Sequence, residues 1–329
     1  MQGFAHVGGH VTLIFSIHDD SENLLEQGSR GAGLSLDHGI QITATANPGS
    51  GEISVTGTSP NQAIHQSVMK ELSTFIPEVM TYDWTVEQHT MLPISQGFGL
   101  SAAGAISCAL AIQRALELPE EKSRSLAIHI AHRIERQLSG GLGDVAALYA
   151  GGVELRLEPG CPPLGNELGG SGAVVSWFQE IPAVVCWRQT ASRHTSTYID
   201  DGDWKLAIRA AGEHTLSGLR EGIWESARWN ELLTASAAFA ERSGLLDDAQ
   251  RVDLLHMVGG ALITSGLVDS DLAVRLCMLG ESAIIVPSNL TGEFPIEWQE
   301  NLVQALNNRG LGALAVSLAD DALNLHSLS

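Results

Sequence analysis

A glycine-rich loop and two carboxylates are the features of this 329-residue chain whose residue types and spacing point to chemistry. The loop lies in the stretch LPISQGFGLSAAGAISCALA, which runs from Leu92 to Ala111. It contains Gly97 and Gly99 and continues as an unbroken run of helix-forming residues. The first amides of a helix lack backbone partners and lie at the positive end of its dipole. We therefore expect this loop to bind an anion, and a phosphate above all.

The loop differs from the two common phosphate-binding motifs. A Walker A motif needs a lysine, and the three lysines of the chain are remote from this loop in the sequence. The dinucleotide fingerprint needs a third glycine where Ala102 stands. We expect the backbone amides of residues 97–103 to hold the phosphate, while a metal ion and arginines from elsewhere neutralise its charge. The alternative is structural: the glycines form a plain turn and Ser101 caps a buried helix.

Glu135 is the first carboxylate that departs from the pattern around it. The segment from Glu120 to Leu138 carries a helical stripe of apolar residues, and Glu135 lies at the margin of that stripe. His129 and His132 fall off the stripe, so we expect them to face solvent. A carboxylate that leans inward is costly unless it is paired or bound to a metal. Two roles stay open: an ion pair with an arginine, or a Mg²⁺ ligand beside the phosphate loop with the Ser101 hydroxyl as a second ligand.

Asp144 is the second carboxylate, and glycines present it in the string GGLGDVAA at the start of a short helix. Aspartate is a good N-cap, so a structural role is open. A capping box is not completed, because Ala147 stands where Glu or Gln would be needed. The functional role is that of a general base, which accepts the proton of a substrate hydroxyl as its oxygen attacks a terminal phosphoryl group.

Short strands and helices alternate along the first half of the chain and must position these groups. Apolar alternation and turn residues predict strands over 10–17, 33–48, 51–60, 83–90 and 153–157, and helices over 61–75, 101–118 and 120–138. Further on, the patterns predict strands over 183–188, 282–287 and 311–318, helical stretches between 203 and 279, and a helix over 296–308. The Pro- and Gly-rich stretch 158–176 is the best boundary. We expect an α+β protein with lobes 1–160 and 175–329, connected by 161–174.

Composition excludes several classes of function. Hydrophobic residues make up 44% and charged residues 17% of the chain, as in ordinary globular proteins. The net charge of −20 argues against binding of nucleic acid or of an anionic membrane. No apolar run is long enough to cross a bilayer and the N-terminus lacks the features of a signal peptide, so we expect a cytoplasmic protein. The four cysteines are dispersed, which favours buried, reduced thiols.

The string PISQGFGLSAAGA resembles the ATP-phosphate motif P-x-x-x-G-L-G-S-S-A-A of the galactokinase, homoserine kinase, mevalonate kinase and phosphomevalonate kinase (GHMP) superfamily. Within it, the archaeal pantoate kinases show the greatest likeness. The strings that carry this likeness appear in the family's order and span most of the chain: FAHVGGHVTLIFSI (4–17), GSRGAGLSL (28–36), GGLGDVAALYAGGVELRLEPG (140–160) and MLGESAIIV (278–286).

The resemblance implies a two-lobed GHMP-kinase-like fold, with an N-terminal α/β lobe that carries the ATP-phosphate loop and a C-terminal ferredoxin-like α+β lobe. It implies Mg²⁺ ligation by Ser101 and Glu135, and places Asp144 as the base or as the group that orients the hydroxyl. Phe98 and Leu100 depart from the commoner Leu and first Ser of the motif, so one polar phosphate contact is in doubt. The residues that it places on ATP are Pro93, Gly97, Phe98, Gly99, Leu100, Ser101, Ala102 and Ala103.

The substrate implied by the resemblance is pantoate, which ATP would phosphorylate on the primary hydroxyl to give 4-phosphopantoate for coenzyme A synthesis. Its carboxylate needs a cation, and Arg30 and Arg156, which lie in family-like strings, are the candidates. The alternative for each arginine is a surface charge or a pair with a nearby acid. His10 is expected to make a polar contact in the cleft, with a structural role as the alternative. Also open are another GHMP kinase, acting on homoserine, mevalonate or shikimate, and a non-catalytic nucleotide-binding relative. A monomer and a homodimer are both compatible with the sequence.

Overall fold

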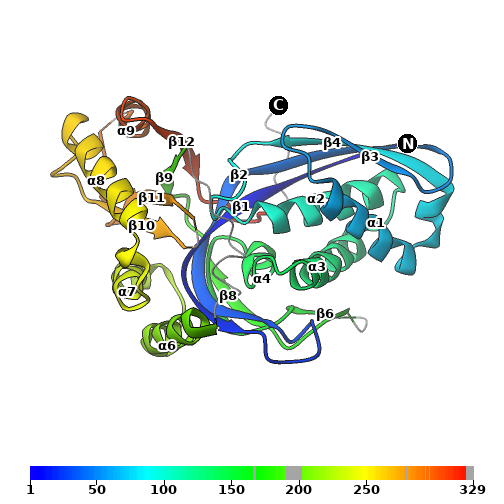
Figure 1. Ribbon diagram of the computed structural model, residues 1–329, viewed down its shortest axis with the longest axis horizontal. Helices are drawn as coiled ribbons and strands as arrows, with labels where there is room; N and C mark the ends of the chain where they lie inside the picture. Colours follow the sequence, from blue (N-terminus) through cyan, green and yellow to red (C-terminus); the bar gives the residue numbers. More distant parts are fainter. Residues whose placement is uncertain (166–167, 190–201, 279, 293, 296, 324–329) are drawn as a thin grey trace.

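The structure is a computed structural model that describes residues 1–165, 168–189, 202–278, 280–292, 294–295 and 297–323 (Figure 1). Its largest sheet runs in the order β3-β4-β2-β5-β8, with β1 paired to β2. The two longest strands, β1 (Gln2–His18) and β2 (Gly28–Pro48), pair antiparallel along almost their whole length. The other strands of this sheet are β3 (Ile53–Gly57), β4 (Tyr82–Thr90), β5 (Val153–Glu158) and β8 (Ala173–Trp177).

Helices α1 (Gln62–Phe75), α2 (Leu100–Ala115), α3 (Glu120–Gln137) and α4 (Asp144–Ala150) belong to the same lobe. Helix α2 is apolar or small on all sides and is buried along nearly its whole length, as such a composition dictates. It packs closely on β1 because Gly3 has no side chain: a Cβ there would lie 2.1 Å from the carbonyl oxygen of Ala111. The C-terminal part of α2 is therefore held close against the sheet.

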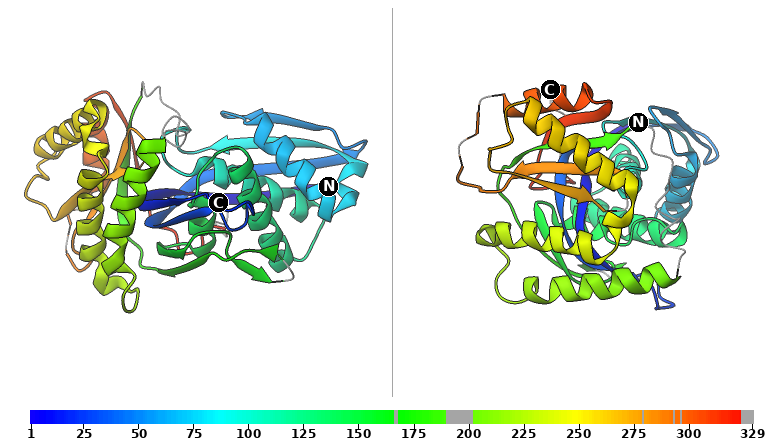
Figure 2. Two further views of the ribbon diagram at one scale, coloured as in Figure 1. Left: turned by 60° about the horizontal axis from the view of Figure 1, so that its bottom comes forward. Right: turned by 60° about the vertical axis from the view of Figure 1, so that its left-hand side comes forward.

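The second lobe is built on an antiparallel sheet in the order β10-β11-β9-β12. Along the chain, one group of helices separates the first two of these strands and another helix separates the last two, which is the expected ferredoxin-like arrangement. Figure 2 shows α6, α7 and α8 side by side. The elements are β9 (Pro182–Arg188), α6 (Gly202–Leu219), α7 (Trp229–Arg242), α8 (Ala249–Thr264), β10 (Leu272–Cys277), β11 (Ser282–Pro287), α9 (Trp298–Asn307) and β12 (Leu311–Ser317).

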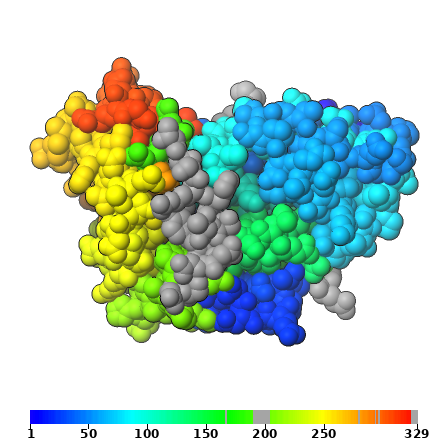
Figure 3. Space-filling model, in the orientation of Figure 1, coloured from blue at the N-terminus to red at the C-terminus, as the bar shows by residue number. Residues whose placement is uncertain are grey.

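The lobe boundary differs from the one expected from the sequence. The stretch 161–174 is not simply a connecting loop, because it contains the paired strands β6 (Pro163–Gly165) and β7 (Leu168–Gly169) and the start of β8. Since β8 pairs with β5, the N-terminal sheet extends to Trp177. The space-filling view shows the two lobes on either side of the molecule, with α8 in yellow and α1 in blue (Figure 3).

The polar side of α3 also differs from what the sequence predicted. His129 and His132 were expected to face solvent, but both are buried. The β6–β7 hairpin and the chain after β1 cover this side of the helix, and His132 Nε2 lies 3.1 Å from the carbonyl oxygens of Leu24 and Gln27. Burial lowers the pKa of His132 to about 4.

The cysteines and the apolar helices bear on two expectations from composition. The four cysteines are free and buried, as expected. Among the described residues, no helix is long and apolar enough to span a bilayer.

Candidate active site

Two glycines of the phosphate loop, just before α2, have backbone conformations that favour glycine. Gly97 and Gly99 have φ angles of +80° and +63°, in the left-handed region that side chains disfavour. A Cβ on Gly99 would also lie 3.1 Å from the Cβ of His10 and 3.3 Å from the Cγ of Asp144. Gly99, and not Ser101, is the N-cap of α2, and no side chain caps the helix. The first amides of α2, at residues 100–102, are thus left without a helical partner.

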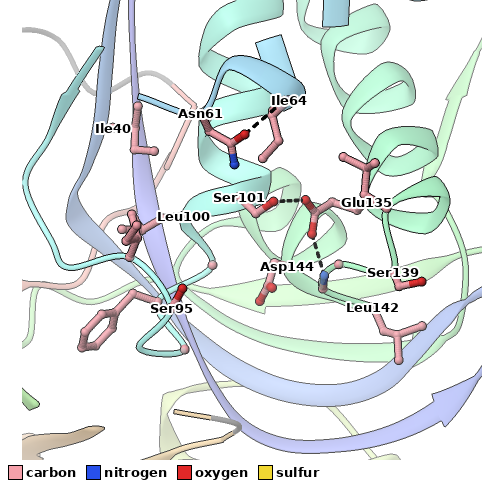
Figure 4. A pocket seen from close by; sticks show the side chains of 18 of the residues that line it. Ile40, Asn61, Ile64, Ser95, Leu100, Ser101, Glu135, Ser139, Leu142 and Asp144 are labelled. Atoms are coloured by element: carbon pink, nitrogen blue, oxygen red, sulfur yellow. Dashed lines mark hydrogen bonds between the residues drawn. The ribbon is translucent and has the colours of Figure 1, made fainter. Parts of the chain in front are cut away.

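A cavity of about 570 Å³ opens in front of these amides. Its walls come from the phosphate loop and the start of α2, from the N-terminal end of α1, and from the turn between α3 and α4 (Figure 4). Glu135 and Asp144 contribute carboxylates to this lining, but among the described residues no lysine or arginine does. The arginines expected to neutralise a phosphate from elsewhere are therefore absent from the described lining.

Glu135 is 1% exposed and leans into the cavity, as its position on the helix predicted. The Ser101 hydroxyl donates a hydrogen bond to Glu135 Oε1, and the Gly141 amide donates one to Oε2 at 2.6 Å (Figure 4). None of the ion pairs among the described residues includes Glu135, so the structural pair with an arginine is not found. Burial, with the nearby charge of Asp144, raises the pKa of Glu135 to about 7.

This donor set fits Mg²⁺. A buried carboxylate without a balancing cation, next to a hydroxyl and in front of helix amides, is the kind of oxygen site that the ion prefers. The described residues contain no cluster of three or more His, Cys, Asp or Glu side chains that would enclose a metal by themselves. That is consistent with Mg²⁺, which usually takes one or two protein carboxylates and completes its shell with water and substrate phosphates.

Asp144 is the first residue of α4, and its side chain makes no capping hydrogen bond. Gly143 is the N-cap, so the structural alternative for Asp144 is not found. Its carboxylate lines the same cavity as Ser101 and Glu135, and its side chain is 20% exposed. The structure thus brings together the three polar side chains that the sequence singled out (Figure 4).

His10 does not make the substrate contact expected from the sequence. Its side chain is fully buried, and it is absent from the cavity lining. Nδ1 lies 2.7 Å from Asp144 Oδ1 and Nε2 lies 3.1 Å from Glu154 Oε1, so carboxylates occupy both ring nitrogens. Burial alone would lower the pKa of His10, but these two carboxylates outweigh burial and raise it.

The two candidate arginines differ in their hydrogen-bond partners. Arg30 lies outside the cavity lining and binds Glu158, Glu213 at 3.3 Å and the Leu157 carbonyl at 3.0 Å, which corrects its assignment to the substrate. Arg156 is buried, with Nη1 bound to Glu154.

Arg156 Nε has no hydrogen-bond partner among the described residues. A Cβ on Gly143 would lie 2.7 Å from this atom and 2.3 Å from Ser29 Oγ, and both Gly143 and Ser29 line the cavity. The unpartnered N–H of Arg156 therefore lies behind Gly143 and Ser29, and Arg156 itself does not line the cavity.

Sequence reasoning missed two of the groups that surround the site. Glu154 was overlooked, although it alternates with Arg156 on one face of an otherwise apolar strand, and that pattern could have flagged both as a buried pair. The roles of Gly280 and Ser282 were also missed. Gly280 lies against Gly97, and the Ser282 hydroxyl donates a hydrogen bond to the carbonyl oxygen of Gln96, so the second lobe supports the phosphate loop directly.

A two-lobed fold with a phosphate loop of this geometry defines a class of small-molecule kinases. Residues 64–152 match the family model described as the GHMP kinases N terminal domain. The chain contains this domain, and its overall fold is that of GHMP kinases. A structure described as a phosphotransferase related to the CoA biosynthesis pathway aligns with a TM-score of 0.73 and 24% identity over 97% of each chain. Phosphomevalonate kinase from Streptococcus pneumoniae aligns with a TM-score of 0.62 and 12% identity, over 97% of this chain and 100% of that one.

Among curated proteins, the relatives are pantoate kinases. The chain is 28% identical to pantoate kinase from Thermococcus kodakarensis over 248 residues, which is 74% of this chain and 76% of that protein. It is 31% identical to pantoate kinase from Methanospirillum hungatei over 163 residues, or 47% of this chain and 51% of that protein. This second match spans about half the length of each protein.

Proposed function

We propose that this protein transfers the terminal phosphoryl group of ATP to the primary hydroxyl of pantoate, and so supplies 4-phosphopantoate for coenzyme A synthesis. The observation that carries the proposal is the placement of Ser101, Glu135 and Asp144 around one cavity at the start of α2. The likeness to pantoate kinases supports the choice of substrate. Because ATP is the phosphoryl donor, we place the reaction in the cytoplasm.

The residues of the chain divide the chemistry among them. The amides of 100–102 bind the terminal phosphates, and Ser101 and Glu135 would hold Mg²⁺, which supplies positive charge to those phosphates when bound. Asp144 accepts a hydrogen bond from the substrate hydroxyl and orients it. The hydroxyl oxygen forms a bond to the terminal phosphorus, the bond from that phosphorus to the ADP oxygen breaks, and Asp144 accepts the hydroxyl proton.

Recognition of the substrate carboxylate falls to Arg156. Its unpartnered Nε–H lies directly behind Ser29 and Gly143, two residues of the cavity lining, and an N–H of a guanidinium is a strong donor to a carboxylate. The cavity lining also includes Phe15 and Leu142, which offer apolar contact to the two methyl groups of pantoate. A cation, a hydroxyl and an apolar wall are the groups that this substrate requires.

The test is a substrate panel with the purified protein. ADP release is measured with Mg²⁺ and ATP in the presence of pantoate, homoserine, mevalonate or shikimate, with Asp144→Asn as the matched control of strongly reduced activity. We expect pantoate alone to stimulate ADP release. Stimulation by another hydroxy compound instead of pantoate would identify a different GHMP kinase activity, and no stimulation by any of them would point to a nucleotide-binding relative without catalysis.

A further inference from the structure

A chain of four charged side chains runs inward from the cavity. It begins at Asp144 on α4, continues through His10 on β1, and ends at Glu154 and Arg156 on β5. The side chains of His10 and Glu154 are fully buried and that of Arg156 is 1% exposed, so only Asp144 reaches the cavity. A buried polar chain of this kind holds each member in one orientation, because every unpaired alternative would be costly.

The fold makes room for the His10 ring and ties its backbone to the phosphate loop. A Cβ on Gly33 would lie 2.3 Å from His10 Nε2, so the glycine leaves space for the ring. The pairing of β1 with β2 is irregular between Gly8 and His10, and the His10 amide bonds to the carbonyl oxygen of Phe98 at 2.9 Å instead. One residue therefore contacts the phosphate loop with its backbone and Asp144 with its side chain.

We propose that His10 is the positioning residue of Asp144: its Nδ1–H binds Asp144 Oδ1, and so leaves Oδ2 to receive the substrate hydroxyl in line with the phosphate. This inference rests on the proposed kinase function. The other ring nitrogen binds Glu154, which in turn binds Arg156. The chain thus joins the group that orients the hydroxyl to the group proposed to bind the substrate carboxylate, and fixes the distance between them.

The proposal is tested by a double-mutant cycle. His10→Gln, His10→Ala, Asp144→Asn and the double variant Asp144→Asn with His10→Gln are assayed for kcat, KM and ATP affinity. A group that positions a catalytic side chain is commonly worth roughly 10- to 100-fold in rate, so we expect His10→Gln and His10→Ala to lower kcat by this factor. We expect ATP affinity to be nearly unchanged, and the double variant to be no slower than Asp144→Asn alone.

His6→Gln is the matched control, because His6 is a buried histidine of the same strand that has no contact with Asp144. We expect it to keep the kcat of the natural protein. Added imidazole should restore part of the kcat of His10→Ala by filling the space of the missing ring, and should not affect Asp144→Asn. If His10→Ala does not fold, the nearly isosteric His10→Gln decides.

Three results would overturn the inference. The first is that the losses of kcat in His10→Gln and Asp144→Asn multiply in the double variant. The second is that His10→Gln has the same kcat as His6→Gln. The third is that imidazole leaves the kcat of a folded His10→Ala unchanged. Failure of the proposed function is a separate result. If the natural protein phosphorylates another member of the substrate panel, the pantoate proposal fails while the cycle, run with that compound, still tests His10. If it phosphorylates none, both proposals are contradicted.

Discussion

At the scale of single residues, Glu135 has a strongly raised pKa. Its pKa is raised to about 7 from an ordinary value of 4.5. Between pH 4.5 and about pH 7 the folded protein binds more protons than the unfolded chain, because Glu135 stays protonated only when folded. The stability that Glu135 contributes therefore falls as the pH rises. Full ionisation of this buried group costs on the order of 3 kcal/mol of unfolding free energy.

We therefore predict that Glu135→Gln removes this loss. Urea unfolding of the nucleotide-free protein, measured at several pH values from about 4.5 to 7, should show the natural protein losing stability relative to Glu135→Gln as the pH rises. His10 and His132 also have shifted pKa values, but they are common to both proteins and cancel in the difference. Equal pH slopes for the two proteins would contradict the burial of an uncompensated Glu135 carboxyl.

The two candidate arginines give a second prediction at this scale. Arg156→Lys keeps the positive charge but loses the unpartnered Nε–H that lies behind Ser29 and Gly143 of the cavity lining, so we expect KM for pantoate to rise roughly 10- to 100-fold. Arg30→Lys is the control, because Arg30 is bound to Glu158 and Glu213 outside the cavity lining. Steady-state kinetics of both variants make the comparison, and an equal rise in KM for the two would refute the assignment of the carboxylate to Arg156.

Single residues were predictable from the sequence where they broke a local pattern. Glu135 stood at the margin of an apolar stripe and Asp144 followed a run of glycines, so both could be singled out, and the structure places them together. The partners of His10 could not be predicted, because Asp144 and Glu154 are 134 and 144 positions away in the sequence. Contacts at such separations are set by how the strands and helices pack together and not by local residue pattern.

At the scale of elements, the junction between the phosphate loop and α2 is the critical one. Gly99 combines a φ of +63° with close approach to His10 and Asp144. We predict that Gly99→Ala lowers stability by about 1–2 kcal/mol from backbone strain and also lowers kcat, since a Cβ displaces the site residues. Thermal unfolding and kinetics measure the two effects.

Gly222→Ala is the matched control for this glycine. Gly222 has a φ of +78°, but a Cβ there would meet nothing within 4 Å. The variant should lose similar stability and keep its activity, because only the backbone strain is shared. Normal kcat in Gly99→Ala would show that the approach of the loop to Asp144 does not matter for catalysis.

Elements differ in how well the sequence predicts them. Helix α2 was evident, because most of its residues are small or apolar and it contains no proline. Strand β10 was not expected, since LAVRLC is short and lies at the edge of its sheet within a stretch that otherwise forms helices. The lobe boundary shifted because β8 pairs with β5, which is a tertiary contact.

At the scale of the whole molecule, the two lobes share one continuous hydrophobic core. Hydrogen bonds also cross between them, from Met278 N to the Thr12 carbonyl at 3.0 Å and from Trp224 Nε1 to the Val153 carbonyl at 2.9 Å. The cavity wall depends on this contact, because Gly280 and Ser282 of one lobe lie against the phosphate loop of the other.

We predict from this shared core that the lobes unfold together. Five of the seven tryptophans follow β8 in the sequence, so fluorescence reports mainly on the second lobe, whereas circular dichroism reports on both. The two thermal transitions should coincide within error, as for a single cooperative unit. A fluorescence transition well below the main circular dichroism transition would show that the second lobe unfolds alone.

The central claim is that helix amides, together with a divalent cation on Ser101 and Glu135, hold the terminal phosphates of ATP next to Asp144. A crystal structure with Mg²⁺ and a non-hydrolysable ATP analogue tests it most directly. The account predicts the terminal phosphates against the amides of 100–102, with the metal ion bound by Ser101 and Glu135. A triphosphate bound elsewhere, remote from both carboxylates, would contradict it.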